Sequence, residues 1–252
     1  MKRFSIAFPL AALLLAVAPP ARAEMSHFSF GGGALSMVKI EIPAPLETTK
    51  AQLSGVKGVL DVDMTDLSKT AGSIDVDLTG IKGYSFTDQD KNDTQTEHMK
   101  NWFEIGEDVN AATRAKNQFA KFTITKVIKA DPPSLAKAST FSDDLGAGRK
   151  FKIVAQGDFT VHGVTKPKTV ELDATLYDLK DGNAQFKDAQ RVLMLRTAKP
   201  FIVSLKEHDV KPRDTGGKFL STALKVVGLK LGDDAQVSLD LRAIQPKPAP
   251  AK

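Results

Sequence analysis

The sequence contains no cysteine among its 252 residues. Disulfides, thiolate metal sites and a lipid-modified N-terminal cysteine are therefore excluded. The chain also has only one Trp and two Tyr. This scarcity disfavours an outer-membrane barrel, which needs aromatic girdles around an apolar outer band. An ordinary apolar core must hold the chain together, and its length is sufficient for one.

Long hydrophobic runs are missing beyond the first 23 residues. Lys2 and Arg3 precede an apolar stretch over residues 6–17, which is followed by Ala21-Arg22-Ala23. A proline interrupts this stretch, and it is shorter than the roughly 20 residues that cross a bilayer. The pattern predicts a secretory signal peptide over residues 1–23, with cleavage after Ala23.

Excess positive charge is also largely absent once that segment is removed. The segment holds three basic residues and no acidic one, so the rest of the chain has 32 basic and 30 acidic residues, a net charge near +2. The lysines are spread among aspartates and glutamates and form no basic stripe. We therefore expect no nucleic-acid partner.

What the chain does have is strict alternation of apolar and polar residues, the pattern of half-buried strands. The count of predicted strands reaches eight or nine. They are predicted at residues 37–42, 59–64, 73–78, 120–129, 151–161, 170–176, 190–197, 200–207 and 237–243.

Other segments break this pattern. Residues 90–103 and 109–118 are rich in helix formers, and residues 218–227 carry an apolar stripe typical of a short amphipathic helix. We expect residues 24–36 to be a flexible leader and 245–252, with their alternating prolines, to be a disordered tail. One domain is then predicted over residues 37–244.

The fold class expected from these elements is all-β. An antiparallel sheet of this many strands removes its exposed edges by closing on itself. We therefore predict a single extended eight-stranded barrel with one or two short helices capping or flanking it. Small barrels of this size either fill with side chains or hold one slender ligand.

Recognisable catalytic and metal-binding motifs are lacking. None of the four histidines has another histidine at i+2, i+3 or i+4, so the usual zinc spacings are missing. His98 with Glu97 or Glu104 is the one candidate for a His-dependent hydrolase. The pair Asp61 and Asp63 is expected on a solvated strand face. His162 lies in a predicted hairpin turn, which favours a structural or rim position over catalysis.

One stretch is similar to a known family. Residues 157–167, GDFTVHGVTKP, resemble the G-D-L-T-I-x-G-V-T-K-P hairpin of the YceI-like proteins. Residues 98–105 and 119–124 resemble two further segments of that family, and the likeness extends over most of residues 37–244. The resemblance implies a lipocalin-like barrel in the bacterial periplasm that binds a polyisoprenoid.

The resemblance and the strand pattern together predict an exported lipid-binding protein rather than an enzyme. The expected ligand is a polyprenyl carrier lipid or an isoprenoid quinone, held for transport or storage. No resident cofactor or metal is expected. Transient contact with a membrane is compatible with this function. The sequence does not determine the oligomeric state, and a homodimer is one option. The residues predicted to line the cavity are the inward-facing set Ile74, Val76, Leu78, Phe122, Ile124, Ile153, Phe159, Leu172, Leu176, Leu239 and Leu241.

Two alternatives remain at this point. Inward leucines fill a core as readily as they line a tunnel, so a packed barrel that acts in stress response or protein interaction is the first. The His-dependent hydrolase built on His98 is the second.

Overall fold

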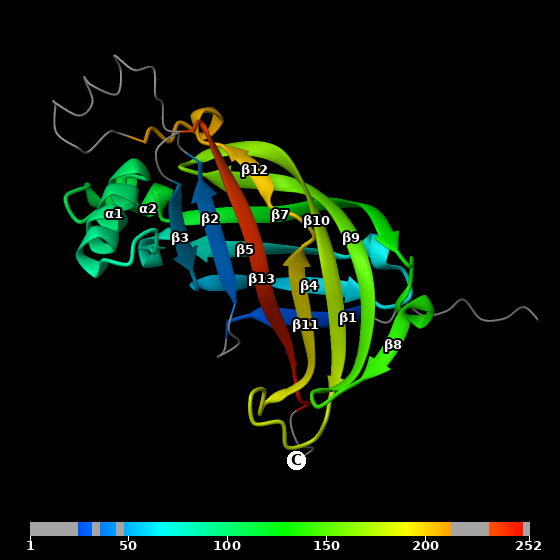
Figure 1. The fold of residues 1–252 in the computed structure, drawn as a ribbon. Coiled ribbons are helices and arrows are strands. Elements are labelled where there is room, and N and C mark those ends of the chain that lie inside the picture. Colours follow the sequence, from blue (N-terminus) through cyan, green and yellow to red (C-terminus); the bar gives the residue numbers. More distant parts are fainter. Residues whose placement is uncertain (1–24, 32–35, 44–47, 213–231, 249–252) are drawn as a thin grey trace, which may run out of the picture.

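A computed structural model describes residues 25–31, 36–43, 48–212 and 232–248. These residues form antiparallel strands, two α-helices and four short 3₁₀ helices (Figure 1). In chain order the elements are β1 (Met25–Phe30), β2 (Met37–Ile42), β3 (Thr49–Leu53), β4 (Val56–Asp63), η1 (Leu67–Lys69), β5 (Ala71–Asp77), η2 (Leu78–Gly80), β6 (Lys82–Gly83), α1 (Gln89–Trp102), α2 (Ala111–Asn117), β7 (Phe119–Asp131), η3 (Leu135–Lys137), β8 (Ser139–Ser142), β9 (Gly146–Val161), β10 (Val164–Leu179), β11 (Ala189–Thr197), β12 (Phe201–Ser204), η4 (Lys206–His208) and β13 (Asp234–Pro246).

Eight strands form a closed ring, in the order β1-β4-β5-β7-β9-β10-β11-β13, and the pairing of β13 with β1 completes it. Strand β2 continues the line of β1 along β13, and β12 continues the line of β11. The predicted all-β fold, an antiparallel ring of eight strands with two flanking helices, is therefore confirmed. We call this ring the barrel.

The barrel has two distinguishable ends. Helices α1 and α2, the β9–β10 turn and η4 lie at one of them, which we call the cavity end (Figure 1). The turn between β4 and β5, with η1, and the η3–β8 segment lie at the other, which we call the packed end. Strands β9 and β10 are each 16 residues long and reach from one end to the other.

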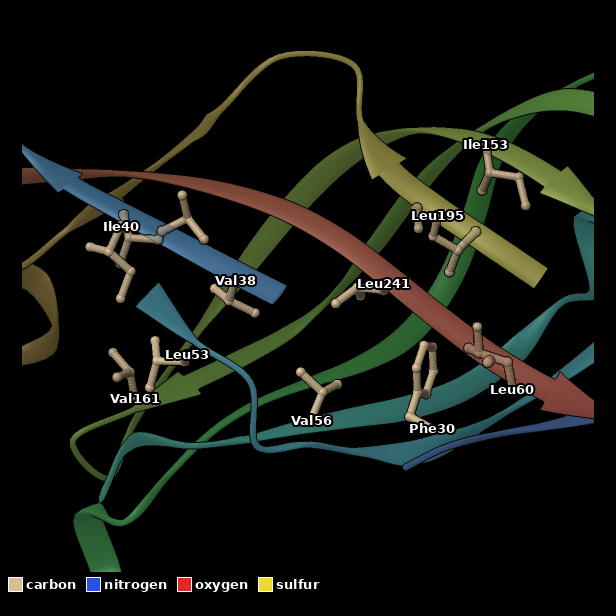
Figure 2. Close-up of a cluster of buried hydrophobic side chains, with 14 of the residues drawn as sticks. Phe30, Val38, Ile40, Leu53, Val56, Leu60, Ile153, Val161, Leu195 and Leu241 are labelled. Atoms are coloured by element: carbon tan, nitrogen blue, oxygen red, sulfur yellow. The ribbon is translucent and has the colours of Figure 1, made fainter. Parts of the chain in front are cut away.

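Alternating side chains from all around the ring meet in its interior. Figure 2 shows Phe30, Leu60, Leu195 and Leu241, which come from four different strands, pointing into one cluster. Each is nearly fully buried. Because successive residues of a strand point to opposite faces, the apolar half of each strand faces this cluster and the polar half faces outward.

Two predicted boundaries are wrong. The flexible leader expected over residues 24–36 contains strand β1, whose Phe28 is 0% exposed, because pairing with β4 carries that side chain into the core. The disordered tail expected over 245–252 starts too early, since β13 continues through Pro246 and the Lys247 amide donates to the Asp188 carbonyl at 2.9 Å.

Two of the three predicted helical segments are confirmed, and the third is untested. Helices α1 and α2 agree with the predictions for residues 90–103 and 109–118. The helix predicted over residues 218–227 lies outside the described residues. Neither α1 nor α2 has the length and apolar character that a membrane-spanning helix requires.

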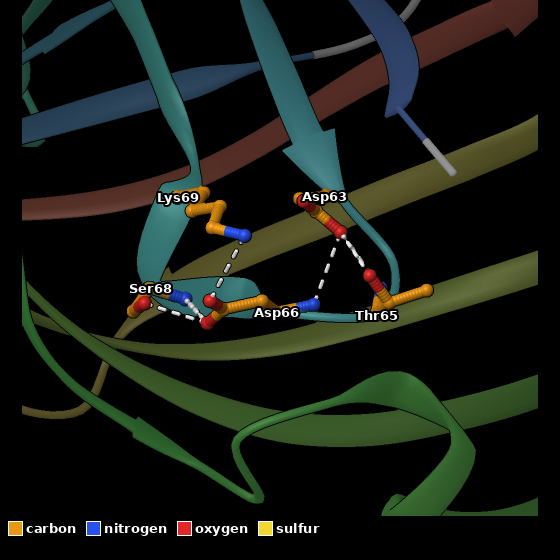
Figure 3. Close-up of polar contacts among 5 residues, drawn as sticks. All are labelled: Asp63, Thr65, Asp66, Ser68 and Lys69. Atoms are coloured by element: carbon orange, nitrogen blue, oxygen red, sulfur yellow. Dashed lines mark hydrogen bonds and ion pairs between the residues drawn. The ribbon is translucent and has the colours of Figure 1, made fainter. Parts of the chain in front are cut away.

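A hydrogen-bonded turn covers the packed end. Asp63 Oδ1 accepts from the Thr65 amide at 2.9 Å, from its hydroxyl at 2.7 Å and from the Asp66 amide at 3.0 Å (Figure 3). Asp66 in turn caps η1 through Ser68. This path directs Leu67 into the core, where it is fully buried.

Asp63 itself departs from the solvated position that its strand pattern suggested. Asp63 is fully buried, because the turn that follows it folds back over it. The hydrogen bond from the Thr65 hydroxyl lowers its pKa, against an opposing effect of burial. The carboxylate is thus a structural acceptor at the packed end.

Candidate functional site

The cavity end of the barrel contains an apolar cavity of about 110 Å³. Strands β2 to β5, β7, β9 to β13, and Phe103 beyond α1 contribute to its wall. Of the 25 lining residues, all but Lys121 are apolar. On β13 the wall runs from Ala235 to Leu241, six residue steps or about 20 Å, so the cavity is elongated along the strand.

Partial exposure of inward side chains distinguishes this end from a packed core. Ile74, Phe122, Phe159 and Leu239 stand on the inner face of their strands yet remain only half-buried. Inward side chains in a close-packed interior are covered on every side. Here they border empty space, which leaves apolar surface available to a ligand.

The structure brings nine of the eleven predicted lining residues together around this cavity. They are Ile74, Val76, Leu78, Phe122, Ile124, Phe159, Leu172, Leu239 and Leu241. That these residues contact a ligand stays a prediction.

The other two predicted residues, Ile153 and Leu176, do not line the cavity. Ile153 is buried in the core on β9, and Leu176 is buried and lines, together with Leu135, a separate pocket at the packed end. Alternation correctly placed both on the inner face. Alternation did not show at which end of the barrel each residue lies, because these strands reach from one end to the other.

Sequence reasoning missed a larger group of lining residues, which is spread over most strands of the barrel. Five of these sixteen residues lie in the strands predicted over residues 37–42 and 200–207, and eight more lie in the other predicted strands. The missed residues are Val38, Ile40, Leu53, Leu60, Phe103, Ala120, Lys121, Ala155, Val161, Val170, Leu195, Phe201, Val203, Leu205, Ala235 and Val237.

A glycine on β9 shapes the cavity wall. A Cβ on Gly157 would lie 2.7 Å from Phe122 Cζ and 2.3 Å from the Thr123 carbonyl oxygen. The ring of Phe122 therefore occupies the space that a side chain at Gly157 would fill. This close approach explains why the alternating run of β9 is interrupted by a residue without a side chain.

Aromatic rings pack edge-on around Phe159. Its ring lies 6.3 Å from that of Phe201 and 5.4 Å from that of His208, both nearly perpendicular to it. His208 is buried, and its Nδ1 donates to the Val164 carbonyl at 3.0 Å. Burial lowers the pKa of His208. The imidazole thus serves as a neutral, packed support for the cavity wall.

A polar pair lies at the rim of the cavity. His162 and Gly163 connect β9 to β10 with positive φ at both positions, 52° and 71°, as in a type I′ turn. His162 Nε2 lies 3.2 Å from Glu104 Oε2, although 58 residues separate them in the chain. Sequence reasoning placed His162 in the turn and missed this partner, because no local pattern connects the two segments.

Charged side chains close the packed end. Arg149 lies 2.9 Å and Arg191 2.7 Å from the carboxylate of Asp178, and Arg191 also donates to the Ser26 hydroxyl at 3.3 Å. The three charged residues stand two positions beyond buried apolar residues of β9, β10 and β11, so they share the inner face. One carboxylate on β10 thus joins two guanidinium groups from the neighbouring strands β9 and β11.

The hydrolase built on His98 gains no support from these contacts. Glu104 pairs with His162, and Glu97 pairs with Lys100 at 2.8 Å. Within the described ranges, no group of three or more His, Asp or Glu side chains is arranged to hold a metal ion.

Comparison with known proteins gives a consistent picture. The family model described as YceI-like domain matches residues 26–243. Among solved structures, a polyisoprenoid-binding domain from Saccharophagus degradans shares the fold, with a TM-score of 0.51, 11% sequence identity, and coverage of 88% of this chain and 100% of that domain. No curated protein has a matching sequence.

Two further solved structures are more distant. BcnA of Burkholderia cenocepacia has a TM-score of 0.44 at 14% identity, with 82% of this chain and 95% of that chain covered. The YceI protein of Campylobacter jejuni has a TM-score of 0.41 at 13% identity, with 78% and 85% covered.

Proposed function

The chain belongs to the YceI-like family, and on that premise we propose that its barrel binds a polyisoprenoid chain in the cavity. The ligand is a polyprenyl carrier lipid or an isoprenoid quinone, and the protein carries or stores it without bond chemistry. The observation that carries the proposal is the apolar wall of the elongated cavity. The Saccharophagus degradans protein that shares the fold is a polyisoprenoid-binding domain, which supports the same ligand class.

The energetics favour such a ligand. Burial of apolar surface contributes about 25 cal/mol per Å², from which the cost of ordering the chain is subtracted. An extended isoprenoid presents apolar surface along its whole length, and the cavity wall on β13 is about 20 Å long. The presence of an apolar cavity inside the ring also favours ligand binding over the packed-barrel alternative.

We place the protein in the periplasm as part of this proposal. The predicted signal peptide over residues 1–23 supports export. In this compartment the protein would take its ligand from one membrane surface and release it at another, with transient membrane contact at each.

The experiment is a titration of delipidated protein with geranylgeraniol in detergent-free buffer. Trp102 is the one Trp of the chain, is buried, and precedes the lining residue Phe103, so its fluorescence is a suitable signal. We expect a saturable change at one ligand per chain and co-elution of protein and ligand in gel filtration. A titration without saturation, together with separate elution, would contradict the proposal.

A further inference from the structure

The rim of the cavity holds a carboxylate in a fixed orientation. Glu104 Oε2 lies 3.2 Å from His162 Nε2 and accepts from Asn117 Nδ2 at 3.4 Å. The His162 side chain is only 9% exposed and Asn117 is buried, whereas the Glu104 side chain is 46% exposed. Two buried polar groups thus hold one oxygen of a carboxylate whose side chain still reaches solvent.

The backbone at this position is strained. Among the described non-glycine residues, positive φ angles occur only at Glu104, His162 and Asp209, at 53°, 52° and 55°. Glu104 and His162 are hydrogen-bonded, and Asp209 is close enough for the charge of His162 to help lower its pKa, after the larger effect of Lys211. Left-handed conformations cost about 1 kcal/mol or more for such residues and cluster at functional sites.

The polar groups are adjacent to the apolar wall. Phe103, which precedes Glu104, and Val161, which precedes His162, both line the cavity. Neighbouring Cα atoms are about 3.8 Å apart, so the backbone of Glu104 lies at the edge of the wall. A chain that fills the cavity and ends at this rim would bring its terminal group next to Glu104.

A second feature of His162 points to the same position. Its Nδ1 is buried and has no hydrogen-bond partner among the described residues. The ring is therefore held through Nε2 alone, and its one directed contact is with Glu104. Holding this carboxylate, at the cost of an unpaired buried nitrogen, is the evident role of His162.

We propose that Glu104 is the acceptor for the polar end of the ligand, and that His162 and Asn117 are positioning residues for it. An ionised carboxylate accepts hydrogen bonds and donates none. It therefore selects a ligand whose chain ends in a hydroxyl donor, such as a long-chain alcohol or a quinol, over a phosphate, whose charge it repels. This inference rests on the proposed function, because it assumes an isoprenoid in the cavity.

The test compares three probes of one chain length on the full protein by Trp102 fluorescence. The probes are geranylgeraniol, the corresponding hydrocarbon without the hydroxyl, and geranylgeranyl phosphate. A hydrogen bond to a charged group is worth enough for about a tenfold preference. We expect the wild type to bind the alcohol about tenfold tighter than the hydrocarbon, and to bind the phosphate no tighter than the alcohol.

The variants locate that preference. Glu104→Gln should reduce the preference for the alcohol over the hydrocarbon about threefold, because its neutral amide oxygen accepts a weaker hydrogen bond, and should leave hydrocarbon affinity unchanged. Glu107→Gln, an exposed residue three positions on, is the matched control and should change neither. His162→Asn, which tolerates positive φ, should reduce the preference about threefold through a less well oriented carboxylate.

Each outcome decides between the claims. Equal affinity of the wild type for alcohol and hydrocarbon would overturn the assignment of Glu104 while leaving chain binding intact. A phosphate bound more than about tenfold tighter than the alcohol would overturn the ligand class. Failure of all three probes to bind would instead overturn the proposed function.

Discussion

The two ends of the barrel are built from the same strands and the same alternation, yet one end encloses an apolar cavity and the other has a packed core beside a partly polar pocket. At the packed end the turn after β4 inserts Leu67 and η3 inserts Leu135, both buried, and Phe28 and Phe151 fill the space between the strands. At the cavity end the inner side chains of β5, β7 and β9 stay half-buried around open volume.

This difference shows that strand pattern alone does not decide whether a barrel binds a ligand. Residues Ile153 and Leu176 fit the inward pattern as well as Phe159 and Leu172 do, and only the latter two line the cavity. What separates them is the insertion of side chains from segments outside the ring. The turn and η3 place Leu67 and Leu135 in the core at the packed end, and a separate pocket lies between these segments, Leu176 and the Arg149 and Arg191 side chains.

The largest expected effect is a difference between the two ends in the free energy of unfolding that is lost when an inward leucine is truncated. Leu193→Ala removes a buried side chain at the packed end and should lower the free energy of unfolding by about 3 kcal/mol, since it leaves a new cavity. Leu239→Ala, which borders an existing cavity, should cost about 1 kcal/mol. Urea denaturation measures both. Equal losses would contradict the difference in packing.

The second prediction concerns the ion cluster of the packed end. Asp178→Asn leaves two guanidinium groups without their shared carboxylate and should cost about 2 kcal/mol, less than a fully buried pair because the three side chains are about one-third exposed. Asp173→Asn, whose partner Lys152 is exposed, is the control and should cost less than about 0.5 kcal/mol. A loss no greater than that of the control would show that the cluster is not structural.

The third prediction is that an added side chain lowers ligand affinity at the cavity end and lowers stability at the packed end. Ala120→Leu adds volume to the cavity wall and should weaken isoprenoid binding about tenfold with little change in unfolding free energy. Ala174→Leu adds the same volume at the packed end, where Ala174 is buried, and should cost about 1.5 kcal/mol while affinity is retained. Titration and denaturation of both variants test this. A reversed pattern would mean that the ends are assigned wrongly.

The sequence alone predicted the features that depend on neighbouring residues, and it missed those that depend on contacts between distant segments of the chain. Alternation predicted most strands of the ring, because the period of two is a local property. It missed β1, where Ser26 stands on the inner face and a Gly-rich segment follows Phe30, so residues 24–36 were assigned to a flexible leader. The burial of Phe28 depends on pairing with β4, which no local pattern reveals.

The candidate site follows the same division. The inward face of nine lining residues was predictable from their strands, whereas depth along the barrel was not. The contact between Glu104 and His162 joins segments 58 residues apart and depends on α1 and α2 meeting the β9–β10 turn. The exclusion of zinc spacings was predictable because it rests on sequence separation alone.

The smallest expected effect is a pH dependence at the cavity end. Burial lowers the pKa of His208 in the folded state, so the unfolded chain binds its proton more readily. Stability from this residue is therefore present above the unfolded pKa, near 6.5, and is lost as pH falls through the folded value. Unfolding free energies from pH 7.5 to 5 should decline less steeply in His208→Gln. An unchanged slope would contradict the assignment.

The most direct test of the central claim, that the cavity end holds an isoprenoid chain, is native mass spectrometry of the protein purified without detergent, followed by organic extraction of the bound material. We expect one isoprenoid per chain in the wild type and a reduced bound fraction in Ala120→Leu. A mass with nothing bound, in a protein that also fails to take up added polyprenyl alcohol or quinone, would contradict it.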